Sequence, residues 1–232
     1  MLPIRDTYPS ASPAIVTWTI VLANVLVFWY ESSLPVADLQ IFVHQFGFTP
    51  ALFLAPGDIV SRIFENFTIV SSMFIHGSLG HLVGNMWMLV IFADNIEDAM
   101  GHFRFFIFYI LMGTMAALSQ AIFIGDPNTP TIGASGAIAG ILGGYCILFP
   151  ESKIITLIPI FIFPWFVEIS AWFFLIVWFL LQFLSGLHPD GDGASVAWWA
   201  HVGGFVAGIT SVHLFVRKKT RLNSYPDQYQ PW

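Results

Sequence analysis

Three stretches of this sequence place polar and ionisable side chains inside segments that are otherwise apolar. They are HGSLGHLVGN at residues 76–85, TIGASGAIAGILGG at residues 131–144 and AWWAHVGGFVAG at residues 197–208. Inside a membrane such groups are costly, so each one suggests a functional role. Ser135 and His201 are the first pair to consider. An imidazole that takes the proton of a serine hydroxyl creates a nucleophile able to attack a carbonyl carbon.

Small residues accompany both of these side chains. Gly136 and Gly140 follow Ser135 at a spacing of four, and Gly204 and Gly208 follow His201 at the same spacing. Small residues four apart let two helix backbones approach closely, and His201 shares the face of Gly204 because it precedes it by three residues. If the two faces pack, Ser135 meets His201. The alternative is that these glycines serve helix packing alone.

His81 and Asn85 are four residues apart, which puts both on one face of a helix. Ser135 is expected at a helix N-terminus, where free backbone N–H groups can hold a developing oxyanion. The Ser135 backbone and the His81 and Asn85 side chains therefore form a candidate oxyanion site. The alternative is that His81 and Asn85 make hydrogen bonds that only tie helices together.

Other residue types limit the chemistry further. No Asp or Glu lies within the apolar segment of His201, so a Ser135–His201 dyad is the economical interpretation. The single Cys146 excludes a cysteine-cluster metal site, and no HExxH pattern is present. We therefore expect neither a metal nor another cofactor.

The composition indicates a membrane protein. Of 232 residues, 9% are charged and 56% are hydrophobic, whereas a soluble domain carries about 25% charged residues. A soluble chain of this length could not bury so much apolar surface, so a lipid bilayer must be the solvent for most of it. The net charge of −6 and the scarcity of basic residues argue against a nucleic-acid partner.

Six segments approach the length of about 20 apolar residues that a membrane-spanning helix needs. They lie at residues 14–30, within 69–93, and at 105–124, 132–149, 169–187 and 194–216. Residues 154–167 contain two prolines and are expected at the interface or as an extension of the fifth helix, rather than as a seventh span. The long connection 31–67 is expected to lie partly in the interface. The predicted fold is an all-α, six-helix membrane domain at 14–216, with tails at 1–13 and 217–232.

The basic residues predict the orientation. With six spans both termini lie on one side, together with seven of the eight Lys and Arg residues, and only Arg62 falls on the other. Because basic residues favour the cytoplasmic side, both termini are predicted to be cytoplasmic. The second, fourth and sixth spans then run inward, so His81, Ser135 and His201 all lie in the outer half of the membrane. The site is expected to open to the extracytoplasmic side.

Together, these clusters resemble the rhomboid family of intramembrane serine proteases. GASG at 133–136 looks like the family's GxSG motif, HLVGN at 81–85 its HxxxN motif, and AHVGGFVAG at 200–208 its sixth-helix motif. Glu97 and Gly101 look like the acidic residue and glycine that follow the second helix. The chain departs from the family in two places. Phe67-Thr68 stands where many members carry Trp-Arg, and Ala139 where some place a tyrosine.

The resemblance implies a Ser135–His201 dyad, an oxyanion site at Ser135, His81 and Asn85, a half-submerged first loop and a fifth helix that gates substrate entry. It implies cleavage in or near the transmembrane segments of single-span proteins, in a prokaryotic cell (inner) membrane. Two alternatives compete: a non-catalytic relative that binds and sorts membrane segments, and a channel or transporter with a histidine proton path. The first typically lacks the Ser or the His, and the second predicts polar residues at every depth. The sequence indicates no particular oligomeric state.

Overall fold

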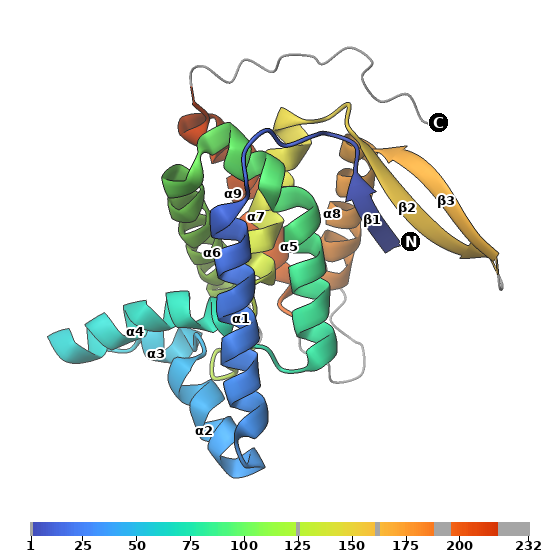
Figure 1. The fold of residues 1–232 in the computed structure, drawn as a ribbon. Helices are drawn as coiled ribbons and strands as arrows, with labels where there is room; N and C mark the ends of the chain where they lie inside the picture. Colours follow the sequence, from blue (N-terminus) through green and yellow to red (C-terminus); the bar gives the residue numbers. More distant parts are fainter. Residues whose placement is uncertain (1, 124–125, 161–162, 188–195, 218–232) are drawn as a thin grey trace.

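The computed structural model describes residues 2–123, 126–160, 163–187 and 196–217 (Figure 1). The elements of the first half are β1 (Leu2–Asp6), α1 (Ile15–Ser33), α2 (Val36–Phe46), α3 (Pro50–Leu54), α4 (Ile59–Ser71), the 3-10 turn η1 (Ser72–Phe74) and α5 (Leu79–Met100). Those of the second half are α6 (His102–Phe123), α7 (Ser135–Leu148), β2 (Lys153–Ile160), β3 (Phe163–Ser170), α8 (Ala171–Leu187) and α9 (Trp198–Phe215).

Helix α7 forms the core of the bundle. It packs against α5, α6, α8 and α9, and all of its residues except Ser135 and Ile147 are buried. The close approach comes from glycine. A β-carbon added to Gly204 would lie 2.2 Å from the carbonyl oxygen of Gly136, and one added to Gly208 would lie 2.0 Å from that of Gly140. The backbones of α7 and α9 are therefore in contact, as the spacing of their small residues predicts.

Two of these glycines also face a helix that the sequence analysis did not consider. Added β-carbons on Gly136 and Gly140 would lie 2.5 Å from Ala116 Cβ and 2.4 Å from Met112 Cβ, both on α6. Thus Gly136 and Gly140 turn their missing side chains toward α6 and their carbonyl oxygens toward α9. A side chain at Gly136 or Gly140 would push α6 away from α7, and one at Gly204 or Gly208 would push α9 away from α7.

Six helices overlap the six predicted spans: α1, α5, α6, α7, α8 and α9. Helix α5 departs most from its prediction, within 69–93, because it begins at Leu79 and continues to Met100. Among the described residues α1, α5 and α6 are long and apolar enough to cross a membrane, and α7 and α8 are shorter apolar helices. The outer face of α1 exposes large apolar side chains such as Trp18, Leu22 and Trp29. A lipid-facing surface of this kind fits a multi-pass membrane protein. Six crossings and cytoplasmic termini remain predictions.

The described residues are mostly helical, as predicted, but the fold is not all-α. Strands β2 and β3 pair antiparallel, and β1 pairs with the other edge of β2, which gives the order β1-β2-β3 (Figure 1). Pro159 of β2 pairs with Pro164 of β3. The prolines exclude a regular helix, while the β-branched and aromatic residues around them favour strands. Residues 154–167 are therefore not an extension of the fifth helix, and 1–13 includes a paired strand.

The connection between the first two spans is itself helical. In Figure 1, α2 runs back alongside the lower part of α1, and α4 extends to the left of the bundle, with α3 beside it. Helix α4 begins after Asp58, whose carboxylate accepts a hydrogen bond from the backbone N–H of Ser61 at 2.9 Å. This bond lowers the pKa of the Asp58 carboxyl group. Ile59, Val60 and Ile63 are exposed, as an interfacial helix would require, and its place in the interface remains a prediction. The predicted C-terminal tail lies outside the described residues, except Arg217.

Candidate active site

The side chains of Ser135 and His201 meet where two helices begin. Ser135 is the first residue of α7, and His201 lies in the first turn of α9. Ser135 Oγ lies 2.8 Å from His201 Nε2, within the range of a hydrogen bond. Ser135 is partly buried and His201 is 8% exposed. The hydroxyl and imidazole that the sequence analysis paired thus lie in position for proton transfer.

Gly133 shapes the turn that leads into Ser135. Its φ angle is 115°, a region that side chains rarely adopt, and its N–H donates to the Ser72 carbonyl at 2.8 Å. An added β-carbon would lie 2.8 Å from His81 Cε1 and 3.6 Å from Asn85 Nδ2. The glycine therefore allows both α5 side chains to approach the chain two residues before Ser135.

His81 and Asn85 lie beside a third polar residue, His76. Asn85 Nδ2 lies 2.9 Å from His76 Nε2, and the rings of His76 and His81 are 5.0 Å apart, edge to face. His76 is 3% exposed, and the sequence analysis gave it no part in the site. Its place in the 76–85 cluster was the signal that it belongs here. Asn85 donates one hydrogen to His76, which leaves its second N–H hydrogen for another acceptor.

A buried carboxylate supports His76 from α1. Both oxygens of Glu31 lie 3.3 Å from the backbone nitrogen of His76, and Glu31 is 2% exposed. Glu31 therefore contacts the loop before α5. The imidazole of His201 has a different hydrogen-bond partner.

That partner is Gln182 on α8, which the sequence analysis missed. Gln182 Oε1 lies 2.7 Å from His201 Nδ1. Two tryptophans complete the surroundings, with ring centroids 5.9 Å away for Trp178 and 6.1 Å for Trp198. A signal was present, because Gln182 is the one polar side chain in the apolar run 171–184. A lone amide in such a segment suggests a functional contact.

A second polar group of residues lies at the other end of α5. The Glu97 carboxylate accepts hydrogen bonds from the Val16 and Thr17 N–H groups, each at 2.8 Å, and from the Thr17 hydroxyl at 2.7 Å. His102 Nδ1 lies 2.6 Å from the same carboxylate. Gly101, with φ at 78°, ends α5 here. Glu97 and Gly101, which the resemblance singled out, therefore join α1 to the end of α5.

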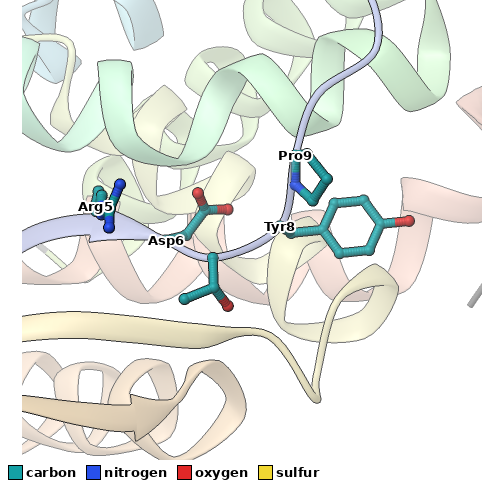
Figure 2. Close-up of a pocket in the computed structure, with 5 residues that line it drawn as sticks. Arg5, Asp6, Tyr8 and Pro9 are labelled. Carbon is teal, nitrogen blue, oxygen red and sulfur yellow. The ribbon is translucent and has the colours of Figure 1, made fainter. Parts of the chain in front are cut away.

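The N-terminal strand is held at this same end. The Asp6 carboxylate accepts a hydrogen bond from Asn95 Nδ2 at 2.6 Å and another from the Tyr145 hydroxyl. Burial raises the pKa of the Asp6 carboxyl group to about 7, with a smaller increase from Asp94. Figure 2 shows the Asp6 carboxylate pointing away from the strands, beside a small pocket that Arg5 and Tyr8 help to line.

No group of three or more His, Cys, Asp or Glu side chains that could hold a metal ion occurs in the part of the chain that the structure describes. The histidines near Ser135 instead contact one another, an amide and a hydroxyl. The chemistry available at this site is that of a hydroxyl beside a base.

The fold and these contacts define a multi-pass membrane helical bundle with a Ser–His pair at two helix N-termini. A model of the rhomboid domain matches residues 64–218. This match covers more than half of the chain, and the chain belongs to the rhomboid family.

Named relatives support the same family. The chain is 30% identical over 155 residues to "Rhomboid protein 1, mitochondrial" of Saccharomyces cerevisiae, covering 61% of this chain and 40% of that protein. It is 30% identical over 151 residues to "Presenilin-associated rhomboid-like protein, mitochondrial" of Homo sapiens, covering 62% and 36%. With "Rhomboid-related protein 1" of Caenorhabditis elegans it shares 26% over 216 residues, covering 88% and 56%.

The chain thus spans between 36% and 56% of the length of these relatives. Two of the three are named as mitochondrial proteins, which does not match the expectation of a prokaryotic cell membrane. Residence in a membrane follows from the family and the apolar helices, and the particular membrane remains a prediction.

Proposed function

We propose that this protein is an intramembrane serine endopeptidase that hydrolyses peptide bonds in or near the transmembrane segments of single-span membrane proteins. The observation that carries the proposal is the 2.8 Å separation of Ser135 Oγ and His201 Nε2. The contact joins a nucleophile to a base at the start of two helices whose backbones touch, so the geometry is held by the core of the bundle.

The reaction follows from the two side chains. His201 Nε2 takes the hydroxyl proton as Ser135 Oγ attacks the scissile carbonyl carbon, and it then returns the proton to the leaving amine. Water attacks the resulting acyl-enzyme with His201 again as the base, which frees Ser135. No cofactor enters these steps.

The developing oxyanion needs donors fixed in advance. Ser135 supplies its backbone N–H at the first position of α7. Asn85 supplies the N–H hydrogen that it does not donate to His76. The His81 side chain is the third donor, and both side chains lie next to Gly133. We assign the oxyanion site to these three groups.

We further propose six crossings with both termini in the cytoplasm and the site open to the opposite side. Arg217 at the end of α9 donates to the Ala99 carbonyl, and Arg104 donates to that of Phe215. Lys153, at the start of β2, pairs with the N-terminal segment. These basic residues gather at the end of the bundle away from Ser135 and His201, which supports the orientation. Lys218, Lys219 and Arg221 lie outside the described residues.

Substrate entry is proposed between α8 and the rest of the bundle, as the resemblance implies. Only Ala171, Leu175 and Gly186 of α8 are buried, so this helix can move at a lower cost in packing than α7. The partners are then single-span membrane proteins in the surrounding bilayer. The proposed compartment is a prokaryotic cell membrane. The mitochondrial names of two relatives make a mitochondrial location the alternative to test.

The test is cleavage of a single-span model substrate by purified protein in vesicles. We expect cleavage by the native chain and none by Ser135→Ala, together with labelling of Ser135 by a fluorophosphonate probe. Ser211→Ala is a matched control, because the Ser211 hydroxyl donates to the Ala207 carbonyl within α9 and its loss should leave cleavage intact. A native chain that neither cleaves nor is labelled would favour the non-catalytic binding and sorting role.

A further inference from the structure

We propose that Gln182 on α8 is a positioning residue that holds the His201 imidazole with its proton on Nδ1. The proposal deepens the function above, since the catalytic consequence rests on the Ser135–His201 dyad. The tautomer itself is a property of the folded protein and can be measured without any substrate.

The argument begins with what each ring nitrogen of His201 contacts. Gln182 Oε1 is an amide oxygen and can only accept a hydrogen bond, so its partner Nδ1, 2.7 Å away, must carry a proton. In the neutral ring, Nε2 is then free of a proton and can accept from the Ser135 hydroxyl at 2.8 Å. One contact thus prepares the other nitrogen to act as a base.

Among the described residues, the rings that neighbour His201 give no competing acceptor to this nitrogen. They belong to Trp178 and Trp198, whose indole nitrogens are donors only. Trp178 precedes Gln182 by one turn of α8, so a single helix supplies both the ring contact and the acceptor. Orientation by a neutral amide takes the place of the carboxylate that soluble serine proteases use for this purpose.

The contact also makes α8 part of the geometry of the dyad. Few side chains of α8 are buried, and Gln182 links this helix to the first turn of α9. Movement of α8 away from α9 would separate Oε1 from Nδ1 and release the imidazole to rotate or to change tautomer. Loss of the acceptor by substitution should have the same effect.

Kinetics give the first measurement, with three variants compared. Gln182→Leu removes the acceptor at similar volume and should lower kcat by about 10²-fold, the typical cost of misplaced reacting groups, with little change in KM. Gln182→Glu keeps an acceptor oxygen and should stay within about tenfold of the native rate. Its negative charge favours the protonated imidazole, so the acid limb of its pH–rate profile should move to higher pH.

Gln120→Leu is the matched control. Gln120 is a buried glutamine whose Oε1 also accepts a hydrogen bond from α9, from the Ala200 N–H at 3.1 Å, one residue before His201. Its loss should lower the melting temperature without changing kcat per folded molecule. If Gln120→Leu and Gln182→Leu behave alike, or if Gln182→Leu keeps the native kcat, the positioning role is wrong.

The second measurement is the ¹⁵N NMR spectrum of the histidine rings in protein purified in detergent, with His201 assigned by its disappearance in His201→Ala. We expect a protonated Nδ1 and an unprotonated Nε2 in the native chain, in Gln182→Glu and in Gln120→Leu, and loss of this pattern in Gln182→Leu. A native ring protonated on Nε2 would overturn the proposal, even if Gln182→Leu failed to fold. A native chain without proteolytic activity but with the expected tautomer would contradict the proposed function and leave the role of Gln182 in place.

Discussion

The two ends of the helical bundle contain the same kinds of polar side chain and arrange them differently. At one end, the Glu97 carboxylate accepts hydrogen bonds from three donors on α1 and also contacts His102. At the other end, His76 Nδ1 is buried and has no hydrogen-bond partner within the described residues, and Asn85 keeps one donor hydrogen free. A saturated group ties helices together, whereas spare donors and acceptors leave room for a substrate.

The comparison also explains why the site depends on the packing of glycines. The end of the bundle with Glu97 is held by directed hydrogen bonds, while the position of Ser135 relative to His201 depends on the contact of α7 with α9. That contact has no side chains between the backbones at Gly204 and Gly208, so it leaves no flexible atoms that could absorb a change.

The largest effect is therefore expected from Gly204→Val. The new side chain would begin 2.2 Å from the Gly136 carbonyl oxygen, and overpacking typically costs about 1–3 kcal/mol. A displacement of about 1 Å at the dyad can lower the rate by about 10²-fold. We expect a lower melting temperature and a loss of kcat together.

The control for this variant is Gly84→Ala, because an added β-carbon at Gly84 meets nothing within 4 Å. Alanine is the better helix former, so stability should rise by roughly 0.5–1 kcal/mol. Unchanged activity and melting in Gly204→Val would show that the contact between α7 and α9 does not set the geometry of the dyad.

A smaller effect on rate is expected from Asn85→Ala and His81→Ala. Removal of one oxyanion donor from a soluble protease costs about 10²–10³-fold in kcat, and two donors would remain here in each variant. We expect losses at or below the lower end of this range, with KM little changed.

Melting temperature measured on the same preparations separates this role from helix tying. If His81 and Asn85 only tie helices together, as Glu97 does at the opposite end, stability will fall and kcat per folded molecule will stay at the native value in both variants. That result would remove them from the oxyanion site.

The smallest expected effect is a pH dependence of the melting temperature, caused by Asp6 at the end of the bundle that holds β1. The pKa of Asp6 is about 7 in the folded protein against an ordinary value of 3.8, because burial disfavours the charged carboxylate. A raised pKa means that the folded state binds the proton more tightly. This contribution to stability is fully present below about pH 4 and is lost as the pH rises through about 7. We expect the melting temperature to fall between pH 5 and pH 8, and Asp6→Asn to reduce that dependence.

The measurement is a series of melting curves at constant ionic strength, for native protein and Asp6→Asn. Equal slopes in the two proteins would show that Asp6 is not the group that titrates. Cleavage per folded molecule should be alike in both at a given pH, because Asp6 contacts Asn95 and Tyr145, away from Ser135.

Particular residues show how far the sequence could be read. The lengths of the apolar segments predicted the approximate positions of the six bundle helices, because burial in lipid requires continuous hydrophobic runs. Strands β2 and β3 were missed because their residues are as apolar as those of a spanning helix. Length and hydropathy do not distinguish the two, although Pro159 and Pro164 already excluded a regular helix. Pairing with residues 2–6 could not be predicted, since nothing local specifies a partner about 150 residues away.

The sequence by itself determined that the chain resides in a bilayer, that Ser135 and His201 lie near the start of helices with small-residue faces, and that both helices run in the same direction. The first two conclusions depend on composition and on spacing within one helix, which are local properties, and the third depends on the number of spans between the two helices. Only the tertiary structure decided which side chains complete the site. Gln182 reaches His201 from α8, and His76 holds Asn85, because the choice of hydrogen-bond partner depends on how helices distant in sequence pack against one another.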